Sequence, residues 1–172
     1  MQAGGKSHEY GHDNQTQQQQ KGSAAHASGF YHRGNFDPCY TAADMADCDG
    51  EMHPRAREGI RLFNEGRYFE AHEELEAAWR DERGSVRGLY QGILEAAVTY
   101  LHIRRGNFAG ALKVYGRSMR WLQKWPEVCR GTDVGQLRRD LGQAIAEMQR
   151  LGEGRLSEFD QAFFRPVISK GG

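Results

Sequence analysis

The sequence predicts an all-α protein, a compact bundle of about five helices behind a disordered leader. From Pro54 onward, apolar residues recur at the three-four spacing of helices, without the alternation of a half-buried strand. Glycine and proline stand where those runs stop. Residues 1–30 are rich in Gln, Gly, Ser and His and have little to bury, so they cannot offset the entropy of ordering. We therefore expect a disordered or loosely docked leader over 1–50 and a bundle domain over 51–172.

The first helix is expected to begin at Pro54, which suits a first turn, and to end at Gly66, which suits a C-terminal cap. More helices are expected at about 68–81, 85–105, 107–124 and 133–151. Thr132 and Asp133 supply an N-cap for the last one. Large apolar residues follow it and should pack back onto the bundle. They are Phe159, Phe163, Phe164, Val167 and Ile168.

A weak internal repeat joins consecutive helices. GRYFEA at 66–71 and GNFAGA at 106–111 share the pattern Gly-x-aromatic-x-x-Ala, each where one helix ends and the next begins. The pattern is typical of tetratricopeptide-like hairpins, in which alanine lets two helices approach closely. Because only these copies occur, a compact bundle is favoured over a solenoid.

Composition indicates a cytoplasmic protein. Lys plus Arg number 23 and Asp plus Glu number 23, so no global field attracts nucleic acid or an anionic membrane. We expect no membrane span, because no apolar run approaches the roughly 20 residues required, and no secretory signal. The cysteines, Cys39, Cys48 and Cys129, are odd in number and sparse, which argues against a secreted disulfide scaffold and fits a reducing cytosol.

A second interpretation of the leader is a metal-binding tail. Cys39 and Cys48 have Asp44, Asp47 and Asp49 as neighbours, and most of the histidines precede Pro54. The spacing is not that of a paired CxxC zinc motif. A plain flexible leader is therefore favoured.

The stretch FNEGRYFEAHEELEAAW, residues 63–79, carries the first candidate site residues. On a helical wheel at about 100° per residue, His72 and Glu76 fall between Trp79 and Phe69, within the apolar sector and one turn apart. Glu73 is also counted among the candidate pocket residues, although on the wheel it points towards solvent. Because an uncompensated buried glutamate is costly, we expect His72 and Glu76 to have partners.

The third helix, SVRGLYQGILEAAVTYLHIRRG, is apolar around most of its circumference, which is typical of a central, buried helix. The exception is a narrow polar stripe of Gln91, Glu95 and His102. Its flanks are Gly88, Gly92 and Thr99. If the stripe faces His72 and Glu76, a polar cluster converges between the second and third helices, with Trp79 closing its side.

Three interpretations of this cluster remain open. In the structural one, Gln91 and His72 hydrogen-bond the glutamates and fix helix register, or the stripe simply faces solvent. The second is a metal site, with His72, Glu76 and Glu95 as weak candidate ligands. It lacks the paired Glu-x-x-His motifs of di-iron bundles, and HEELE is not HExxH. The third is an acid-base or small-ligand pocket, with burial raising the pKa of Glu76 or Glu95. No nucleophile, phosphate loop or cofactor fingerprint identifies a reaction or a cofactor.

FNEGRYFEAHEELEAAW and QGILEAAVTYLHIRRGNFAGALKVY, within residues 56–125, resemble a small bacterial and archaeal family known as domain of unknown function 309. The family pattern runs approximately FNxGxYFExHExLExxW, then QGxxQxAxAxxHxxRGNxxGA. The resemblance implies a compact all-α bundle in the cytoplasm, with no established activity. The matching positions are Asn64, Gly66, His72, Glu73, Glu76, Trp79, Gln91, Gly92, His102, Gly106 and Asn107. Glu95 stands where the family commonly has a second Gln, which adds a carboxylate to the candidate pocket.

The fourth helix offers an interaction surface of a different kind. Lys113, Arg117, Arg120 and Lys124 form a basic stripe bordered by Trp121, which could hold an acidic protein or a nucleic-acid backbone. Zero net charge favours an ordinary solvated face, so we do not expect a nucleic-acid partner. The sequence leaves a homo-oligomer open.

Together these observations predict a structural or ligand- or partner-binding helical module with its candidate site between the second and third helices. The alternative is a metal-dependent hydrolase with Glu76 or Glu95 as general base.

Overall fold

The computed structural model describes residues 47–169, so most of the expected leader lies outside the described residues. The helices are α2 (Pro54–Asn64), α3 (Tyr68–Asp81), α4 (Arg87–Arg104), α5 (Phe108–Leu122) and α6 (Val134–Leu151). Short 3-10 turns follow at Glu153–Glu158 and Gln161–Phe163. The all-α prediction is confirmed, and each expected helix is present within two residues of its expected start. None of the helices in residues 47–169 is long and apolar enough to cross a membrane.

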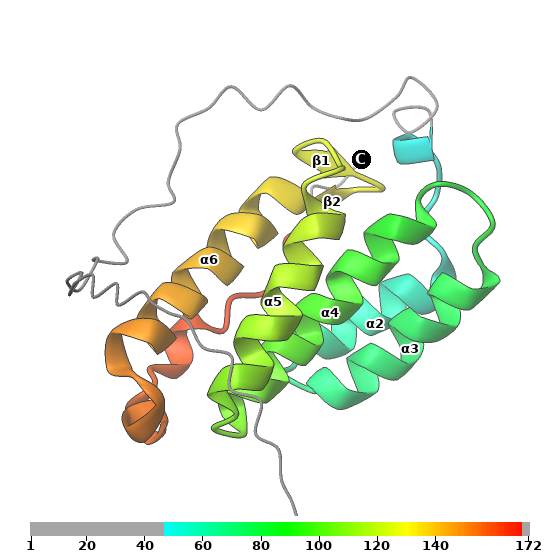
Figure 1. Cartoon of the computed structure of the whole chain (residues 1–172). Coiled ribbons are helices and arrows are strands. Elements are labelled where there is room, and N and C mark those ends of the chain that lie inside the picture. Colours follow the sequence, from blue (N-terminus) through cyan, green and yellow to red (C-terminus); the bar gives the residue numbers. More distant parts are fainter. Residues whose placement is uncertain (1–46, 170–172) are drawn as a thin grey trace, which may run out of the picture. The chain divides into compact units, whose positions relative to one another are not determined.

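Helix α4 is the centre of the bundle. It packs against α3 on one side and α5 on the other, as Figure 1 shows, while α2 packs against α3 and α6 lies beyond α5. Leu89, Tyr90, Ile93 and Tyr100 on α4 are all fully buried. The sequence predicts a central, buried helix because most of its circumference is apolar, and the structure agrees, since neighbours cover this helix on several sides.

The repeated motif ends α2 and α4 in the same way. Gly66 and Gly106 have φ angles of 74° and 71°, a left-handed conformation that glycine adopts without steric cost. In each copy the glycine N–H bonds a carbonyl of the last turn, and the N–H of the next residue bonds the carbonyl one position earlier. This is a Schellman cap, which satisfies carbonyls that the helix leaves open. Asn107 then begins α5, accepting a hydrogen bond from the Gly110 N–H at 2.8 Å.

The close approach of α4 to α5 depends on Gly92. A Cβ atom there would lie 2.6 Å from Cδ2 of Leu122, so a larger residue fits only if the buried Leu122 side chain or the helices shift. The Ser118 hydroxyl donates to the Gly92 carbonyl at 2.9 Å and fixes the crossing. Gly92 was singled out from the sequence as a neighbour of the polar stripe, and its structural role is this contact.

The tail after α6 returns to the bundle, as predicted, with one exception. Phe159 and Val167 are buried, and Phe164 packs its ring 5.1 Å from that of Tyr100. The prediction is wrong for Ile168, whose side chain is 44% exposed. Its backbone carbonyl instead accepts a hydrogen bond from the Asp133 N–H at 2.8 Å, so main-chain pairing fixes the residue and its side chain stays in solvent.

Asn64 at the end of α2 holds this tail in place. Its amide nitrogen donates to the Val167 carbonyl at 3.0 Å, and its Oδ1 accepts from the Val167 N–H at 2.7 Å. One side chain thus satisfies both main-chain groups of a residue 103 positions away. An amide is required because a carboxylate has no N–H to donate.

Two expectations from the sequence are wrong in part: that the domain contains no strands, and that its cysteines indicate a reducing cytosol. Val128–Cys129 (β1) and Thr132–Asp133 (β2) form a small antiparallel pair between α5 and α6. Each of these strands has only two residues, which is too short for an alternating sequence pattern to indicate a strand. Cys48 forms a disulfide with Cys129, 81 positions away. The cysteine count therefore gives no support to a reducing compartment, and Cys48 is not the metal ligand suggested for the leader.

The disulfide anchors a strap, residues 47–52, across the loop before α4. Asp47 accepts hydrogen bonds from the Ser85 N–H at 2.8 Å and the Ser85 hydroxyl at 2.6 Å, and these bonds hold the pKa of its carboxyl below the usual range. Asp47 is thus a loop anchor here. Asp44 and Cys39, the other tail ligands considered, lie outside the described residues.

Replacing Asn64 with Ala should lower the free energy of unfolding by about 1–3 kcal/mol, because two hydrogen bonds to backbone groups are lost. Urea denaturation would measure this loss, and amide hydrogen exchange should show faster exchange at Val167. Asn107→Ala, which removes the α5 cap at a cost of about 1 kcal/mol, is the control and should leave Val167 protected. Unchanged exchange at Val167 in Asn64→Ala would contradict the assigned role.

Reducing the Cys48–Cys129 disulfide should lower stability by about 4 kcal/mol, the loop-closure estimate for a bridge of this span. Thermal melts with and without reductant would measure the effect. Cys48→Ser and Cys129→Ser should be equally destabilised and insensitive to reductant, whereas Cys39→Ser should behave like the wild type. Free thiols at both positions in protein purified without reductant would refute the pairing.

Candidate functional site

His72 and Glu76 lie on a half-buried edge of α3. The Glu76 carboxylate accepts a hydrogen bond from Arg80, one turn on, at 2.6 Å. The His72 ring stacks on Phe69, with ring centroids 6.5 Å apart, and Phe69 is itself 50% exposed. Glu73 is exposed. Glu76 therefore has a partner, as expected, but that partner is an arginine of its own helix. An exposed ion pair of this kind contributes little to stability.

The polar stripe of α4 makes its described contacts with α5. Glu95 is 5% exposed, and its Oε1 accepts hydrogen bonds from Gln91 at 3.0 Å and from Arg117 of α5 at 3.2 Å. Thr99 is fully buried and donates its hydroxyl to the Glu95 carbonyl at 2.8 Å. The interpretation in which the stripe faces solvent is therefore wrong for Glu95 and for Thr99 beside it.

His102, the third member of the stripe, is half-buried near the end of α4. Burial lowers the pKa of its imidazole, and the charges of Arg105 and Arg117 lower it further. Each of these effects opposes protonation. The environment of His102 therefore favours the neutral form of its imidazole.

One oxygen of Glu95 lacks a hydrogen-bond donor in the part of the chain that the structure describes. Among residues 47–169, no donor reaches Oε2, although that atom is buried from solvent. Oε1 already accepts two bonds, so the carboxylate is satisfied on one side only. A buried carboxylate oxygen that lacks a donor costs free energy. The arrangement is therefore not a fully satisfied structural network.

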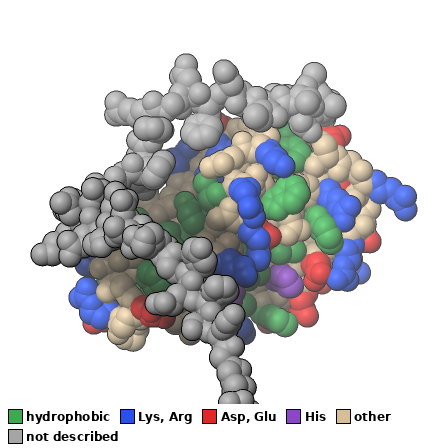
Figure 2. All heavy atoms as spheres, in the orientation of Figure 1, with side chains coloured by type: hydrophobic (Ala, Val, Ile, Leu, Met, Phe, Trp, Pro, Cys, Tyr) green, Lys and Arg blue, Asp and Glu red, His purple; other side chains and the backbone are tan. Residues whose placement is uncertain are grey.

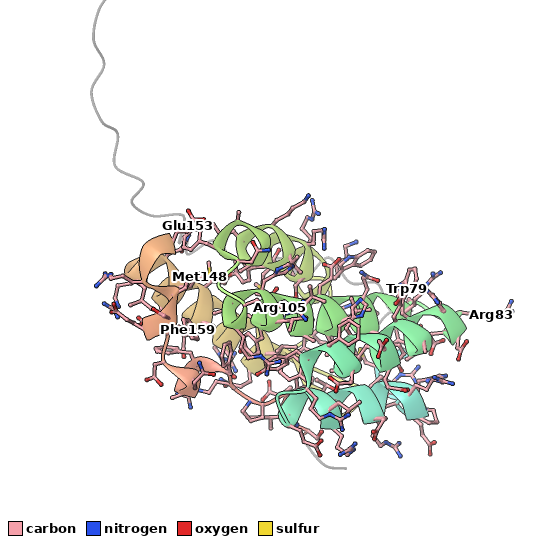
Figure 3. All side chains as sticks on the ribbon, turned by 90° about the horizontal axis from the view of Figure 1, so that it is seen from below. Trp79, Arg83, Arg105, Met148, Glu153 and Phe159 are labelled. Atoms are coloured by element: carbon pink, nitrogen blue, oxygen red, sulfur yellow. A yellow bond between two sulfur atoms is a disulfide. The ribbon has the colours of Figure 1, made fainter. Side chains whose placement is uncertain are left out.

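Glu95 is one of the residues that line a cleft of about 830 Å³ between the ends of α3, α4 and α5. Its lining residues are Trp79, Gly84, Ser85, Arg87, Gly88, Gln91, Glu95, Trp121, Lys124 and Trp125. We call this the tryptophan cleft. Of the predicted pocket residues, Trp79, Gln91 and Glu95 line it; His72, Glu73, Glu76 and His102 do not. In Figure 3, Trp79 lies towards the Arg83 end of the bundle, far from Met148 and Phe159.

Aromatic walls and a cationic rim characterise the tryptophan cleft. The Arg87 guanidinium lies over the Trp79 ring, 4.0 Å from its centroid, and the Lys124 ammonium lies 4.7 Å from that of Trp121. Such cation–π contacts hold long side chains at a defined place. Figure 2 shows Lys and Arg side chains beside hydrophobic ones on this face of the molecule.

Trp125 forms the deep wall of the cleft. The residue is 4% exposed, and within the described part of the chain its indole Nε1–H has no acceptor. A Cβ at Gly88 would lie 3.3 Å from the Trp121 ring and 3.4 Å from the Trp125 ring, so both rings pack directly on the α4 backbone. Sequence reasoning noted Trp121 and Lys124 as an outer surface but missed Trp125 and Arg87. The only sequence signal was Gly88, which leaves room beside the stripe.

The basic stripe is partly engaged in these contacts. Arg117 pairs with Glu95, and Lys124 lies over Trp121, while Lys113 and Arg120 are exposed. That the chain does not bind nucleic acid stays a prediction.

No metal centre is evident in the described range. Within residues 47–169, no three His, Cys, Asp or Glu side chains are grouped so that they could hold a metal ion. Of the candidate ligands, Glu76 bonds Arg80 and Glu95 bonds Gln91 and Arg117.

Residues 56–114 match the model of the family described as "Domain of unknown function (DUF309)". The chain is also similar to an uncharacterized protein, YpuF, of Bacillus subtilis (strain 168), with 42% identity over 57 residues. That alignment covers 33% of this chain and 33% of the relative, so the match spans about a third of the relative's length. The matched family segment includes α3, α4 and the first part of α5. Trp121, Lys124 and Trp125 lie beyond it.

Replacing Glu95 with Met should raise the free energy of unfolding by about 1 kcal/mol, because a half-satisfied buried charge is removed while the shape is kept. The Arg117 side chain is 42% exposed and can turn to water. Chemical denaturation would measure the change.

The control is Glu147→Met on α6. Both oxygens of Glu147 bond Arg150 at 2.7 Å, so the same substitution there should lower stability slightly. A loss of about 3 kcal/mol or more in Glu95→Met would show that this carboxylate locks α4 to α5.

Proposed function

We propose that the helical domain is a non-catalytic binding module that holds a small organic ligand in the tryptophan cleft. The observation that carries this proposal is the Glu95 carboxylate, which lines the cleft and is buried, with one oxygen bonded and the other without a donor among the described residues. A donor on a ligand would satisfy Oε2. The half-satisfied network then has a reason to exist, because functional sites commonly reduce the stability of the free protein.

The composition of the cleft supports a small ligand. Sites for small molecules are typically 300–1,000 Å³, largely apolar and aromatic, with a few polar groups that fix orientation, and the cleft has about 830 Å³. The tryptophans supply apolar contact area. Hydrogen bonds to Glu95, Gln91 and the Trp125 indole would fix the orientation of the ligand. The rim cations are held in place before a ligand arrives, which reduces the entropy lost on binding.

A metal-dependent hydrolase finds less support. A general base must reach the proton it removes, and Glu76 is bonded to Arg80 on the outer edge of α3. Glu95 lines the tryptophan cleft, yet its charged partner is Arg117, a cation that would oppose a second cation beside it. The cytoplasmic location and the domain boundary at residue 51 stay predictions.

The test is a thermal-shift screen of the full chain against a chemically diverse set of small molecules. A ligand at about 100 times its Kd should raise Tm by about 5–10 °C. The rise should persist in Glu147→Met and disappear in Glu95→Met. If no compound raises Tm, or if the hits stabilise Glu95→Met as well as the wild type, the tryptophan cleft is not the binding site.

A further inference from the structure

We infer that the ligand of the tryptophan cleft is a nucleoside phosphate, with its base against the tryptophans and its phosphate at Arg87 and Lys124. The inference rests on the proposed function and adds the chemical class. It follows from four demands that the cleft makes of an occupant. They are a donor for Glu95, an acceptor for Trp125, a flat apolar body for the walls and a negative charge for the rim.

The interior polar groups require a donor and an acceptor on one ligand. Glu95 Oε2 accepts only, and Trp125 Nε1–H donates only. Gln91 lines the cleft beside Glu95, and its amide nitrogen is committed to Oε1 at 3.0 Å. The hydrogen-bonding edge of a nucleobase carries ring or exocyclic N–H donors next to carbonyl or ring-nitrogen acceptors. Proteins that hold an unpaired base read that edge while aromatic side chains stack on its faces.

The walls suit a flat ring. Three tryptophans line the cleft: Trp79 on α3, Trp121 on α5 and Trp125 just after α5. The rings of Trp121 and Trp125 pack against the α4 backbone at Gly88. Stacking of a base on an aromatic ring contributes about 1–3 kcal/mol per base. The Arg87 guanidinium above Trp79 presents a second planar surface of the kind on which bases also stack.

The rim favours an anion. Arg87 and Lys124 are exposed cations at the mouth, while Glu95 is the one carboxylate among the residues that line the cleft. Arg and Lys are the side chains that bind phosphate most effectively, Arg through its planar fork and Lys as a point charge. A purely cationic ligand would meet repulsion at this mouth before it reached Glu95.

An aromatic amino acid is the nearest competitor. Its ammonium group could donate to Glu95 Oε2, and its carboxylate could reach the rim. Phenylalanine would supply no acceptor for the buried Trp125 Nε1–H, because its ring carries no nitrogen or oxygen, and it would therefore gain one interior hydrogen bond fewer than a nucleobase. A nucleobase satisfies both interior groups.

A nucleoside phosphate can be free or can belong to a nucleic-acid strand. Lys113 and Arg120, the exposed remainder of the basic stripe, continue along α5 from the cleft and could follow further phosphates. The two sources share the chemistry that the cleft recognises. They differ in two measurable ways: affinity for a strand should rise with the length of the strand, and it should fall more steeply as the salt concentration rises.

The experiment is a titration of the full chain by intrinsic tryptophan fluorescence and calorimetry. The probes are the common 5′-mononucleotides, their nucleosides, inorganic phosphate, free phenylalanine and a short single-stranded oligonucleotide. At least one mononucleotide should bind, its nucleoside about tenfold more weakly because a charge-assisted contact is lost, and phosphate alone not measurably. Tighter, salt-sensitive binding of the oligonucleotide would assign the source to a strand.

Two variants locate the contacts. Lys124→Ala should weaken the mononucleotide about tenfold and leave the nucleoside within about twofold, whereas Arg120→Ala, on the same stripe but outside the cleft, should change neither mononucleotide nor nucleoside binding. Glu95→Met should abolish both. Glu95-dependent binding of phenylalanine, or of another ligand without phosphate, in the absence of nucleotide binding would overturn the ligand class while keeping the proposed function. Glu95-independent nucleotide binding, or no binding of any compound here and in the thermal screen, would overturn both.

Discussion

The contact between α4 and α5 at Gly92 is the constraint on which the rest of the structure depends. Leu122 occupies the space that a side chain at position 92 would need, with a separation of only 2.6 Å from the Cβ position. This approach places Trp121 and Trp125 on the α4 backbone at Gly88 and lets Arg117 reach Glu95. A wider crossing would expose Glu95 to water, and its second oxygen would then need no partner from the protein or from a ligand.

The strap and the cleft are mechanically connected. Ser85 lines the cleft and donates two hydrogen bonds to Asp47, and the next residue, Cys48, is bonded to Cys129. Arg130 donates its side-chain N–H groups to carbonyls of Asp47 and Glu51, which fastens the strap a second time. One wall of the tryptophan cleft is therefore held by residues that lie far away in the sequence, and its shape depends on a covalent bond outside the family segment.

Helix positions and caps could be predicted from the sequence because they depend on neighbouring residues: Asp133 caps α6, and Gly66 ends α2. The stripe on α4 was also predictable, since periodicity shows which residues share a face. Periodicity does not show which helix that face meets. From the sequence, His72 and Glu76 of α3 are candidate partners of the stripe, whereas in the structure Glu95 pairs with Arg117 of α5. The disulfide and the role of Trp125 depend on tertiary contacts over long separations, which periodicity does not reveal; Gly88 indicates room beside the stripe but not which side chain fills it.

The central claim is that the unpartnered groups of Glu95 and Trp125 are reserved for a ligand. Nitrogen-edited magnetic resonance of the Trp125 indole N–H tests it most directly, because that proton reports its own hydrogen bond. The account predicts that adding a bound mononucleotide shifts the Trp125 indole signal downfield and slows its exchange with solvent, and that neither change occurs in Glu95→Met. An indole signal that is unmoved by a ligand bound in the cleft, or that is already slow to exchange and hydrogen-bonded in the free protein, would contradict it.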